Sequence, residues 1–138
     1  MKKPIGWIIK SVLAKGYKKT SPRTRVAETI ERHKGIFSAQ DITHALRSLD
    51  RVSVYRTLEL LASLDIIHPI VHLEGAQYYE LHGNTHHHHV VCTRCHRSAC
   101  IECDVPRIRV RGFQATHHTF IVTALCTSCA KRTRPSRV

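Results

Sequence analysis

Cysteine and histidine are the residues of this sequence whose types and spacing could do chemistry. All 6 cysteines and most of the 12 histidines lie after Gly83. Four of the cysteines form two CxxC pairs, Cys92 with Cys95 and Cys126 with Cys129. Two such pairs can surround Zn²⁺ with four thiolates, and a site without an open coordination position stabilises a fold rather than catalysing a reaction. The spacing therefore predicts a structural zinc site.

Two alternatives to this zinc site stay open at the level of the residues. A thioredoxin-like redox role needs one CxxC at the start of a helix in a strand-helix-strand unit, whereas both pairs here lie in segments rich in β-forming residues. A third pair, Cys100 and Cys103, means that four cysteines between positions 92 and 103 could hold a metal by themselves. A metal ligand, a redox thiol and a buried apolar side chain all fit Cys103.

Four consecutive histidines at residues 86–89 run directly into a strand-like Val-Val-Cys segment. Because side chains alternate across a strand, His87 and His89 should face one way and His86 and His88 the other. Imidazole suits Zn, Fe, Ni and Cu, and two histidines do not complete a site, so each pair needs further ligands. The candidates on either side of the run are Glu80, His82, Cys100, Glu102, Cys103, His117 and His118.

The composition predicts a small, basic, metal-dependent chain. With 138 residues there is room for one ordinary domain or two very small ones, and very small domains need metals, disulfides or a partner subunit. The net charge of +12 favours DNA, RNA or an acidic membrane surface as a partner. The apolar segment at residues 5–13 is too short to cross a bilayer and lacks a cleavage site. We therefore expect a cytoplasmic chain without a membrane partner, in which cysteines bind metal rather than form disulfides.

Residues 1–82 are expected to form helices that are closed by a β-hairpin. The apolar spacing predicts four helices, at about residues 5–15, 26–34, 39–49 and 52–64. A turn at Ser21-Pro22 should precede the second helix, and Ser38 should cap the third. Residues 66–73 and 76–81 are rich in β-forming residues and predict the hairpin. This order is typical of a winged helix, whose last helix enters the major groove of DNA.

The last of these helices carries the candidate DNA-binding residues. Arg56 is placed to reach bases or phosphates, with Ser53 and Tyr55 beside it, and Thr57 should also point away from the apolar stripe. A helical packing module without nucleic acid is the alternative, in which Tyr55 is a core residue and Arg56 a solvated charge. The basic residues at 131–137 are expected to form a disordered end that adds nonspecific attraction to phosphates.

Several separated motifs, in their order along the chain, resemble the ferric uptake regulator family over about residues 20–129. The motifs are TSPR at 20–23, FSAQDI at 37–42, SVYRTLELL at 53–61, YYEL at 78–81, HHHHVVCTRC at 86–95, GF at 112–113 and HHTFIVTALCTSC at 117–129. The resemblance implies an α+β fold, with a winged helix at residues 1–82 and a small α/β dimerisation domain with structural zinc at residues 83–138. It also implies metal-dependent binding of a homodimer to a palindromic DNA operator, with repression of metal-uptake or stress genes.

The resemblance also implies roles for individual residues. It implies structural zinc at Cys92, Cys95, Cys126 and Cys129, a hinge sensing site that draws on Glu80, His87 and His89, an additional site at His86, His88 and His118, and a DNA helix that carries Ser53, Tyr55 and Arg56. In the additional site, His88 stands where the family often has an aspartate.

The sequence departs from the family at three places. Ile36 replaces a histidine that many members use to tie the DNA-binding domain to the sensing metal, and His33 is out of register with it. The segment between Cys95 and Gly112 is several residues short, so a helix there should be shortened or absent. Cys100 replaces an acidic residue, and its softer thiolate should shift preference from Fe²⁺ towards Zn²⁺. We therefore expect a regulatory site of Glu80, His87, His89 and Cys100, with His82 in reserve for either site.

The sequence thus predicts a metal-sensing repressor that holds one structural Zn²⁺ and a second divalent metal, Zn²⁺ or Fe²⁺. Two alternatives use the same fold: an iron-based peroxide sensor, and a zinc-stabilised DNA-binding module without metal sensing. A zinc hydrolase or deaminase would need paired His-x-Glu and Pro-Cys-x-x-Cys motifs, which the sequence lacks. We therefore expect neither an enzyme nor a small-molecule substrate.

Overall fold

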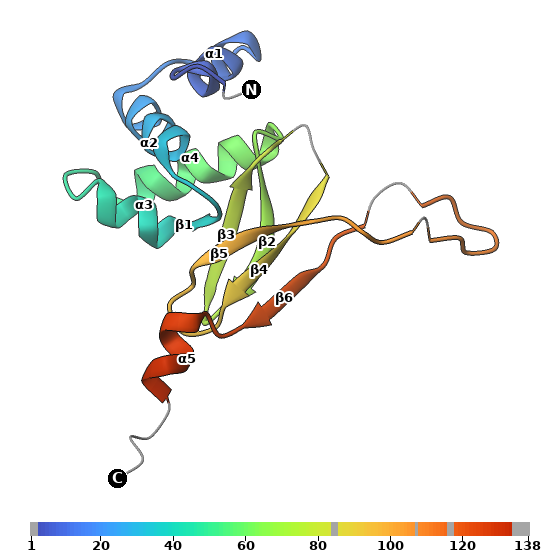
Figure 1. The fold of residues 1–138 in the computed structure, drawn as a ribbon. Helices are drawn as coiled ribbons and strands as arrows, with labels where there is room; N and C mark the ends of the chain where they lie inside the picture. Colours follow the sequence, from blue (N-terminus) through green and yellow to red (C-terminus); the bar gives the residue numbers. More distant parts are fainter. Residues whose placement is uncertain (1–2, 84–85, 107, 116–117, 134–138) are drawn as a thin grey trace. The chain divides into compact units, whose positions relative to one another are not determined.

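Helices dominate the first part of the chain and strands the second in the computed structural model (Figure 1). The structure describes residues 3–83, 86–106, 108–115 and 118–133. The chain divides into two units, Met1–His82 and Gly83–Val138, and the boundary between them lies where the composition of the sequence changes. In the described part of the chain, every helix is too short or too polar to cross a membrane.

The first unit consists of four helices and a small sheet. Its elements are α1 (Trp7–Ala14), α2 (Ser21–Arg32), β1 (Phe37–Ser38), α3 (Ala39–Ala45), α4 (Arg51–Ser63), β2 (Ile67–Leu73) and β3 (Ala76–Leu81). The apolar stripes of the helices meet in one core, in which Ile30 of α2, Ile42 of α3 and Leu58 of α4 are almost completely buried. Burial of this apolar surface is the main force that holds the helices together.

Two helix boundaries differ from the sequence-based prediction. The α2 helix begins at Ser21, because the Thr20 side chain accepts a hydrogen bond from the Arg23 amide and Pro22 fits the first turn, where its missing N–H is not needed. Ser21-Pro22 is thus the start of the helix rather than a turn before it. The α3 helix ends at Ala45, so Leu49 lies beyond it, although this side chain still packs against the core.

The predicted cap of α3 is confirmed. The Ser38 side chain accepts from the Asp41 amide, and the Asp41 carboxylate accepts from the Ser38 amide in return. This reciprocal pair satisfies two amides that the helix itself leaves unpaired. It fixes the point at which the chain enters α3.

The predicted hairpin is also confirmed and forms the wing. Strands β2 and β3 pair antiparallel, and Glu74 and Gly75 between them both have positive φ, as a two-residue hairpin turn requires. The short strand β1 pairs with the other edge of β3, which gives the order β1-β3-β2. A helical core with this small sheet is a winged helix within an α+β fold, as predicted.

The second unit contains a mixed sheet followed by a helix. Its elements are β4 (His87–Cys92), β5 (Ser98–Glu102), β6 (Ile121–Ala124) and α5 (Thr127–Thr133). The order is β5-β4-β6, with β4 antiparallel to β5 and parallel to β6. The described residues between β5 and β6 contain no helix, in line with the short segment in the sequence.

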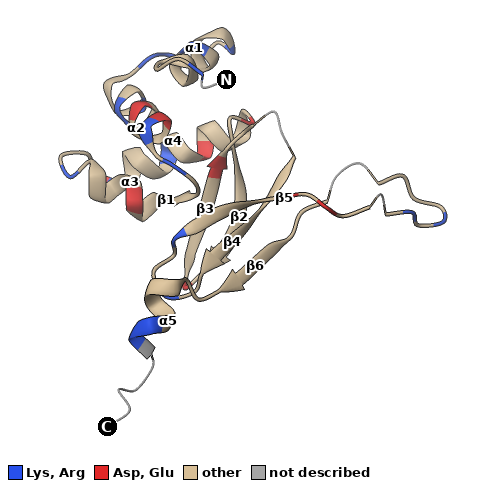
Figure 2. Cartoon of the chain, in the orientation of Figure 1, with Lys and Arg blue, Asp and Glu red and all other residues tan. Residues whose placement is uncertain are grey.

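The end of the chain differs from the prediction. Cys129 lies inside α5, so the second CxxC pair spans the start of a helix rather than a β-rich segment. Lys131 and Arg132 belong to this helix instead of a disordered end, and they are visible as blue segments in Figure 2. The remaining residues of the predicted basic end, 134–137, lie outside the described residues.

Candidate metal centres and nucleic-acid interface

The two CxxC pairs of the zinc prediction meet in the second unit. Cys92 ends β4, and Cys126 follows β6, whose last residue is the partner of Cys92 in the parallel ladder. The ligand atoms of all four cysteines lie within 4.8 Å of one another. The Sγ atoms of Cys95 and Cys126 are 3.8 Å apart. All six cysteines of the chain are free thiols.

This cluster fits a tetrahedral zinc ion. Zn–S bonds of about 2.3 Å at tetrahedral angles place neighbouring sulfurs about 3.8 Å apart. N–H groups of Cys126, Cys95 and Arg94 donate to the Cys92 sulfur and lower the pKa of its thiol to about 5. A hydrogen bond with Cys126 raises the pKa of Cys129 to about 12. The cluster therefore already favours negative charge on part of its sulfurs, which a divalent cation would neutralise.

His87, His88 and His89 lie on β4, His86 directly precedes the strand, and the run has the predicted alternation. The ring centroids of His87 and His89 are 4.9 Å apart, and those of His86 and His88 are 4.7 Å apart. His89 is paired directly with Cys100 of β5, so both side chains lie on one face of the sheet. The ligand atoms of His87, His89 and Cys100 lie within 4.8 Å of one another. Three of the four residues predicted for the regulatory site therefore come together on the second unit.

Glu80 and His82, the other two candidates for these sites, belong to the first unit. Glu80 lies on β3 opposite His68 of β2, and its Oε2 is 3.6 Å from the His68 Nε2. His82 follows β3, with its Nδ1 3.9 Å from the Asp65 carboxylate and its ring 5.5 Å from the His68 ring. Within the first unit, both residues thus contact neighbours that the metal-site prediction did not name.

The other face of β4 carries a cluster of three histidines and a cysteine. The His118 Nε2 lies 3.1 Å from the His86 Nε2 and 3.2 Å from the Cys103 Sγ. His88 completes the cluster and is only 1% exposed. Burial, followed by the nearby His86 and His118 rings, lowers the pKa of His88 and favours its neutral, ligating form. The sequence-based reasoning grouped His82 with these histidines, whereas the structure brings Cys103 to them.

The candidate DNA helix, α4, presents one polar face to solvent. The exposed residues follow helical spacing along it and are Arg51, Val52, Tyr55, Arg56, Glu59 and Ser63. Ser53 is half-buried, and its hydroxyl donates to the Asp50 carboxylate that caps the helix. Thr57 was expected to point away from the core but is only 4% exposed, and its hydroxyl donates to the Ser53 carbonyl. A polar side chain on the buried face is tolerated because this hydrogen bond satisfies it.

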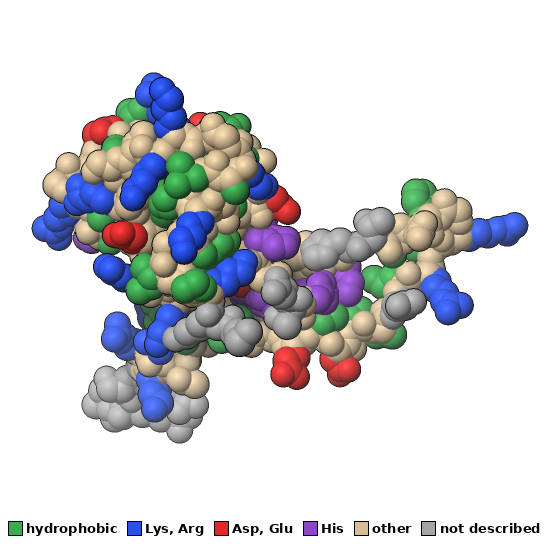
Figure 3. Space-filling model, turned by 90° about the horizontal axis from the view of Figure 1, so that it is seen from above, with side chains coloured by type: hydrophobic (Ala, Val, Ile, Leu, Met, Phe, Trp, Pro, Cys, Tyr) green, Lys and Arg blue, Asp and Glu red, His purple; other side chains and the backbone are tan. Residues whose placement is uncertain are grey.

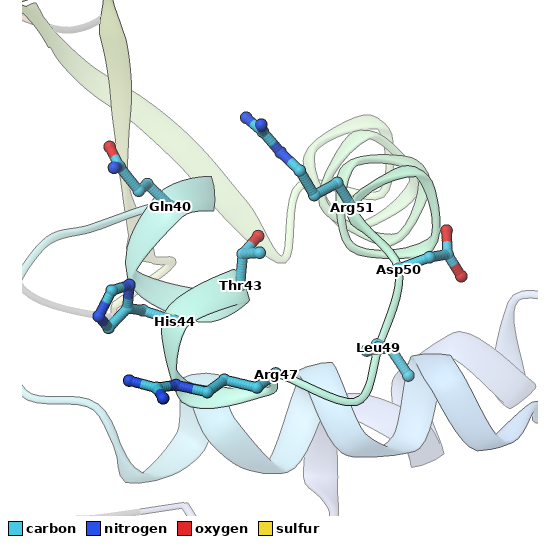
Figure 4. Close-up of a pocket in the computed structure, with 7 residues that line it drawn as sticks. All are labelled: Gln40, Thr43, His44, Arg47, Leu49, Asp50 and Arg51. Carbon is cyan, nitrogen blue, oxygen red and sulfur yellow. The ribbon is translucent and has the colours of Figure 1, made fainter.

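An open hollow of about 440 Å³ lies between α3 and the start of α4. Figure 4 shows Thr43 and Arg51 directed into the space between the two helices, with Gln40 at the rim. His44 and Arg47 of the same region also line the hollow. These donors suit phosphate oxygens. On the face of the first unit seen in Figure 3, Lys and Arg side chains cover more area than Asp and Glu.

The sequence-based reasoning missed two sets of candidate residues. For Cys103 the sequence leaves three roles open, and this residue lies just beyond β5, where strand alternation no longer predicts the direction of a side chain. Arg47 and Arg51 were also missed, although Arg51 precedes Tyr55 by four residues and so shares its helix face. That spacing was a signal that could have identified Arg51.

Comparisons with known proteins agree with this arrangement. The model of the ferric uptake regulator family matches residues 14–123. The ferric uptake regulation protein of Bacillus subtilis is 31% identical over an alignment of 143 positions. The alignment covers 94% of this chain and 96% of that protein. The Helicobacter pylori protein of the same name is 30% identical over 89 residues, which cover 62% of this chain. This match spans only 59% of the length of the Helicobacter pylori protein.

Solved structures share the fold. The Helicobacter pylori ferric uptake regulator, described as having three functional metal binding sites, superposes with a TM-score of 0.72 at 19% identity over 94% of this chain and 95% of that one. A zinc uptake regulator complexed with zinc and DNA gives a TM-score of 0.58 at 18% identity over 93% of each chain. The family match over most of the chain, together with the Bacillus subtilis relative, shows that this protein belongs to the ferric uptake regulator family.

Proposed function

We propose that this protein is a metal-responsive regulator that binds DNA through its first unit and divalent metal through its second. The observation that carries the proposal is the pairing of the α4 surface with the cluster of His87, His89 and Cys100 in one chain. The α4 surface is an exposed basic helix face, which suits DNA. The cluster consists of metal-binding side chains, which suit a divalent cation. The zinc- and DNA-bound relative supports the same combination.

The DNA-binding half of the proposal assigns α4 to the major groove. Tyr55, 45% exposed, and Arg56 lie on the solvent face of a helix that a winged-helix fold presents to DNA. Arg51 and Arg47 line the hollow between α3 and the start of α4 and would hold the phosphate backbone. Ser53 was also predicted to contact DNA, and its bond to Asp50 assigns its hydroxyl to the cap in the free protein.

The metal-binding half assigns separate roles to two clusters. The four thiols of Cys92, Cys95, Cys126 and Cys129 would hold a structural Zn²⁺, whose chemistry their spacing fits. His87, His89 and Cys100 would hold the sensed cation, with Glu80 as the fourth ligand that the family resemblance suggests. One thiolate with two imidazoles favours Zn²⁺ over Fe²⁺. We therefore propose that Zn²⁺ is the signal.

We assign the protein's partners to a second copy of the chain and a palindromic operator. Several large apolar side chains of the second unit are exposed: Ile108, Val110, Phe113, Val122 and Leu125. Side chains of this kind on a small unit are typical of a subunit interface. A symmetric dimer would present two copies of α4 to two half-sites of one duplex. Such a regulator acts in the cytoplasm and represses transcription when metal is abundant.

In this mechanism the chain's own residues convert metal binding at the sensing site into a higher affinity for DNA. A divalent cation supplies a fixed positive centre when it is bound. His87, His89 and Cys100 would hold the cation, with Glu80 of the first unit as the further ligand that the family resemblance implies. The first unit would then occupy a restricted set of positions. The fraction of molecules in which Arg56 and its neighbours fit two half-sites would therefore rise.

Binding to duplexes selected from a random-sequence pool in the presence of Zn²⁺ tests this function. Protein with one zinc per chain should bind a selected duplex weakly, and added Zn²⁺ should tighten binding at least about 10-fold. Arg56→Ala should weaken binding about 10-fold at saturating Zn²⁺, whereas Arg32→Ala, which removes the same charge from α2, should change it little. Cys100→Ser should keep the structural zinc and lose the response. Recovery of no preferred duplex would contradict the proposal.

A zinc-stabilised DNA-binding protein without sensing is the second candidate. Ile36 favours it, because this residue is apolar and 5% exposed at the position where the family resemblance implies a metal-binding histidine. This candidate predicts equal DNA affinity with one zinc per chain and with added Zn²⁺. The same titration therefore separates the two functions.

A further inference from the structure

The segment between β5 and β6 contains a run in which arginine alternates with branched apolar residues. Residues 107–113 read Arg-Ile-Arg-Val-Arg-Gly-Phe, and residues 105–120 include no aspartate or glutamate. This is the short segment from which a family helix was expected to be missing, and its described residues contain no helix. The three positive charges of the run serve neither the proposed metal sites nor the α4 surface.

A defined turn ends this run. The Phe113 N–H donates to the Val110 carbonyl at 3.1 Å, and the two residues form an antiparallel bridge. Gly112 has a φ of 83°, whereas the φ of Arg111 before it is not positive. This combination is that of a type II turn, whose third position favours glycine. Arg111 therefore occupies the second position of the turn. We call residues 108–113 the basic turn.

Both arginines of the basic turn are available to a partner. Every residue from 108 to 115 is exposed. In the described part of the chain, neither ion pair involves Arg109 or Arg111. On this segment, Figure 2 shows blue at the turn and red near the end of β5. Because side chains alternate along extended backbone, Arg109 points away from Ile108 and Val110, which remain for the proposed subunit interface.

We propose that the basic turn is a second DNA contact, in which Arg109 and Arg111 hold phosphates of the duplex without reading its base sequence. The contact rests on the proposed function, because it requires that the chain bind DNA. It adds a DNA-binding surface on the second unit to the α4 surface of the first.

The chemistry of the turn favours this partner. A guanidinium group presents a planar set of N–H donors that matches two oxygens of one phosphate. DNA offers such phosphates in a continuous row, and contacts to them give affinity without sequence preference. Two surfaces of one chain also act at a high effective concentration on a duplex that either one holds. A turn too weak to bind DNA alone can therefore still strengthen the complex.

An anionic membrane also offers phosphates, but the turn fits it less well. A membrane contact would need the apolar side chains of the turn to enter the lipid beside the arginines. Ile108 and Val110 point away from Arg109, and the proposed subunit interface already uses them. DNA needs only the charged side.

DNA binding of the full chain at several salt concentrations tests the contact. Each phosphate contact that is lost lowers the slope of log K against log salt by about 0.9, so Arg109→Ala combined with Arg111→Ala should lower it by about 2 per chain. The affinity at low salt should fall about 10-fold, by the same factor for a selected duplex and for one of random sequence. Arg56→Ala should instead weaken the selected duplex more than the random one.

Two control variants keep the effect specific to the turn. Arg32→Ala combined with Lys34→Ala removes two exposed charges at and just beyond the end of α2, and it should change the salt slope little. Arg109→Lys combined with Arg111→Lys keeps the charges and should retain most of the slope. Every variant should keep the zinc content and the oligomeric state of the parent.

The outcomes separate this contact from the proposed function. A double alanine variant with the parent's slope and affinity would overturn the contact, as would equal weakening in the Arg32 and Lys34 control. Loss of binding to anionic phospholipid vesicles, with unchanged DNA affinity, would identify a membrane contact instead. If Arg56→Ala weakens DNA binding and the double variant does not, only the contact fails. If the parent binds no duplex, the proposed function fails with it.

Discussion

The two units of this protein are held together by different kinds of side chain. In the first unit, apolar residues from all four helices and the sheet form one continuous core. In the described residues of the second unit, the buried apolar side chains are Val91, Cys92 and Cys129, and the buried polar ones are His88 and His89. Four of these five can ligate metal. The first unit can therefore fold by apolar burial, whereas the second depends on its metal ligands.

Loss of one thiol from the Cys92 cluster should have the largest effect. Structural zinc contributes on the order of 10 kcal/mol to the folding of small zinc domains. Cys92→Ser should therefore lose the zinc and unfold the second unit, while the first keeps its helical circular dichroism signal. Zinc content by elemental analysis checks this result. Cys103→Ser is the matched control and should retain the zinc.

Acidification should release the same zinc reversibly. The pKa of Cys92 lies at about 5, below its ordinary value of 9.0, because backbone N–H groups donate to its sulfur. Its contribution to stability is therefore complete above pH 9.0 and is lost as the pH falls through about 5. Zinc should remain bound at neutral pH and appear in a chelating dye as the pH approaches 5. Zinc release that does not change with pH would count against these ligands.

A cavity in the first unit should have a smaller effect, confined to that unit. Leu58→Ala removes a side chain that is 1% exposed and should lower the free energy of unfolding by about 2–5 kcal/mol. The only tryptophan, Trp7, packs against this core, so its fluorescence follows the first unit during denaturation. Val52→Ala, on the exposed face of α4, is the control. Loss of zinc from Leu58→Ala under native conditions would show that the second unit depends on the stability of the first.

Removal of a helix cap should have the smallest effect. Ser38→Ala deletes the acceptor of the Asp41 amide and should cost about 1 kcal/mol. Ser63→Ala, at the C-terminal end of α4, removes a hydroxyl that only donates to the Leu60 carbonyl of its own helix, so it should cost a few tenths of a kcal/mol. Urea unfolding monitored at Trp7 measures both. An equal decrease in the free energy of unfolding for both variants would show that the Ser38 cap stabilises the protein no more than the Ser63 hydroxyl does.

Local patterns predicted much of the fold. Helical and strand spacing gave α4 and the hairpin, and the alternation of His86 to His89 follows from strand geometry alone. The sequence-based prediction misses the start of α2, because proline marks a turn but also suits the first turn of a helix, as Pro22 does here. Thr57 was misassigned because its hydroxyl finds a partner within its own helix.

Features that depend on distant segments were harder to predict. The pairing of β1 with β3 joins residues about 40 positions apart, and the two-residue β1 carries no strand pattern of its own. The contact between Cys103 and His118 joins the two ends of the segment that connects β5 to β6. Spacing identified both CxxC pairs as candidate ligands, but only the family resemblance separated their cluster from Cys100 and Cys103.

Amide hydrogen exchange of the full chain, with and without a strong chelator, tests whether metal holds the second unit together while the proposed DNA-binding unit folds without metal. Chelation should abolish protection in β4, β5 and β6 and leave α2 and α4 protected. Loss of protection in α2 and α4 together with the sheet, or protection of β4 that survives removal of all metal, would contradict this difference between the units.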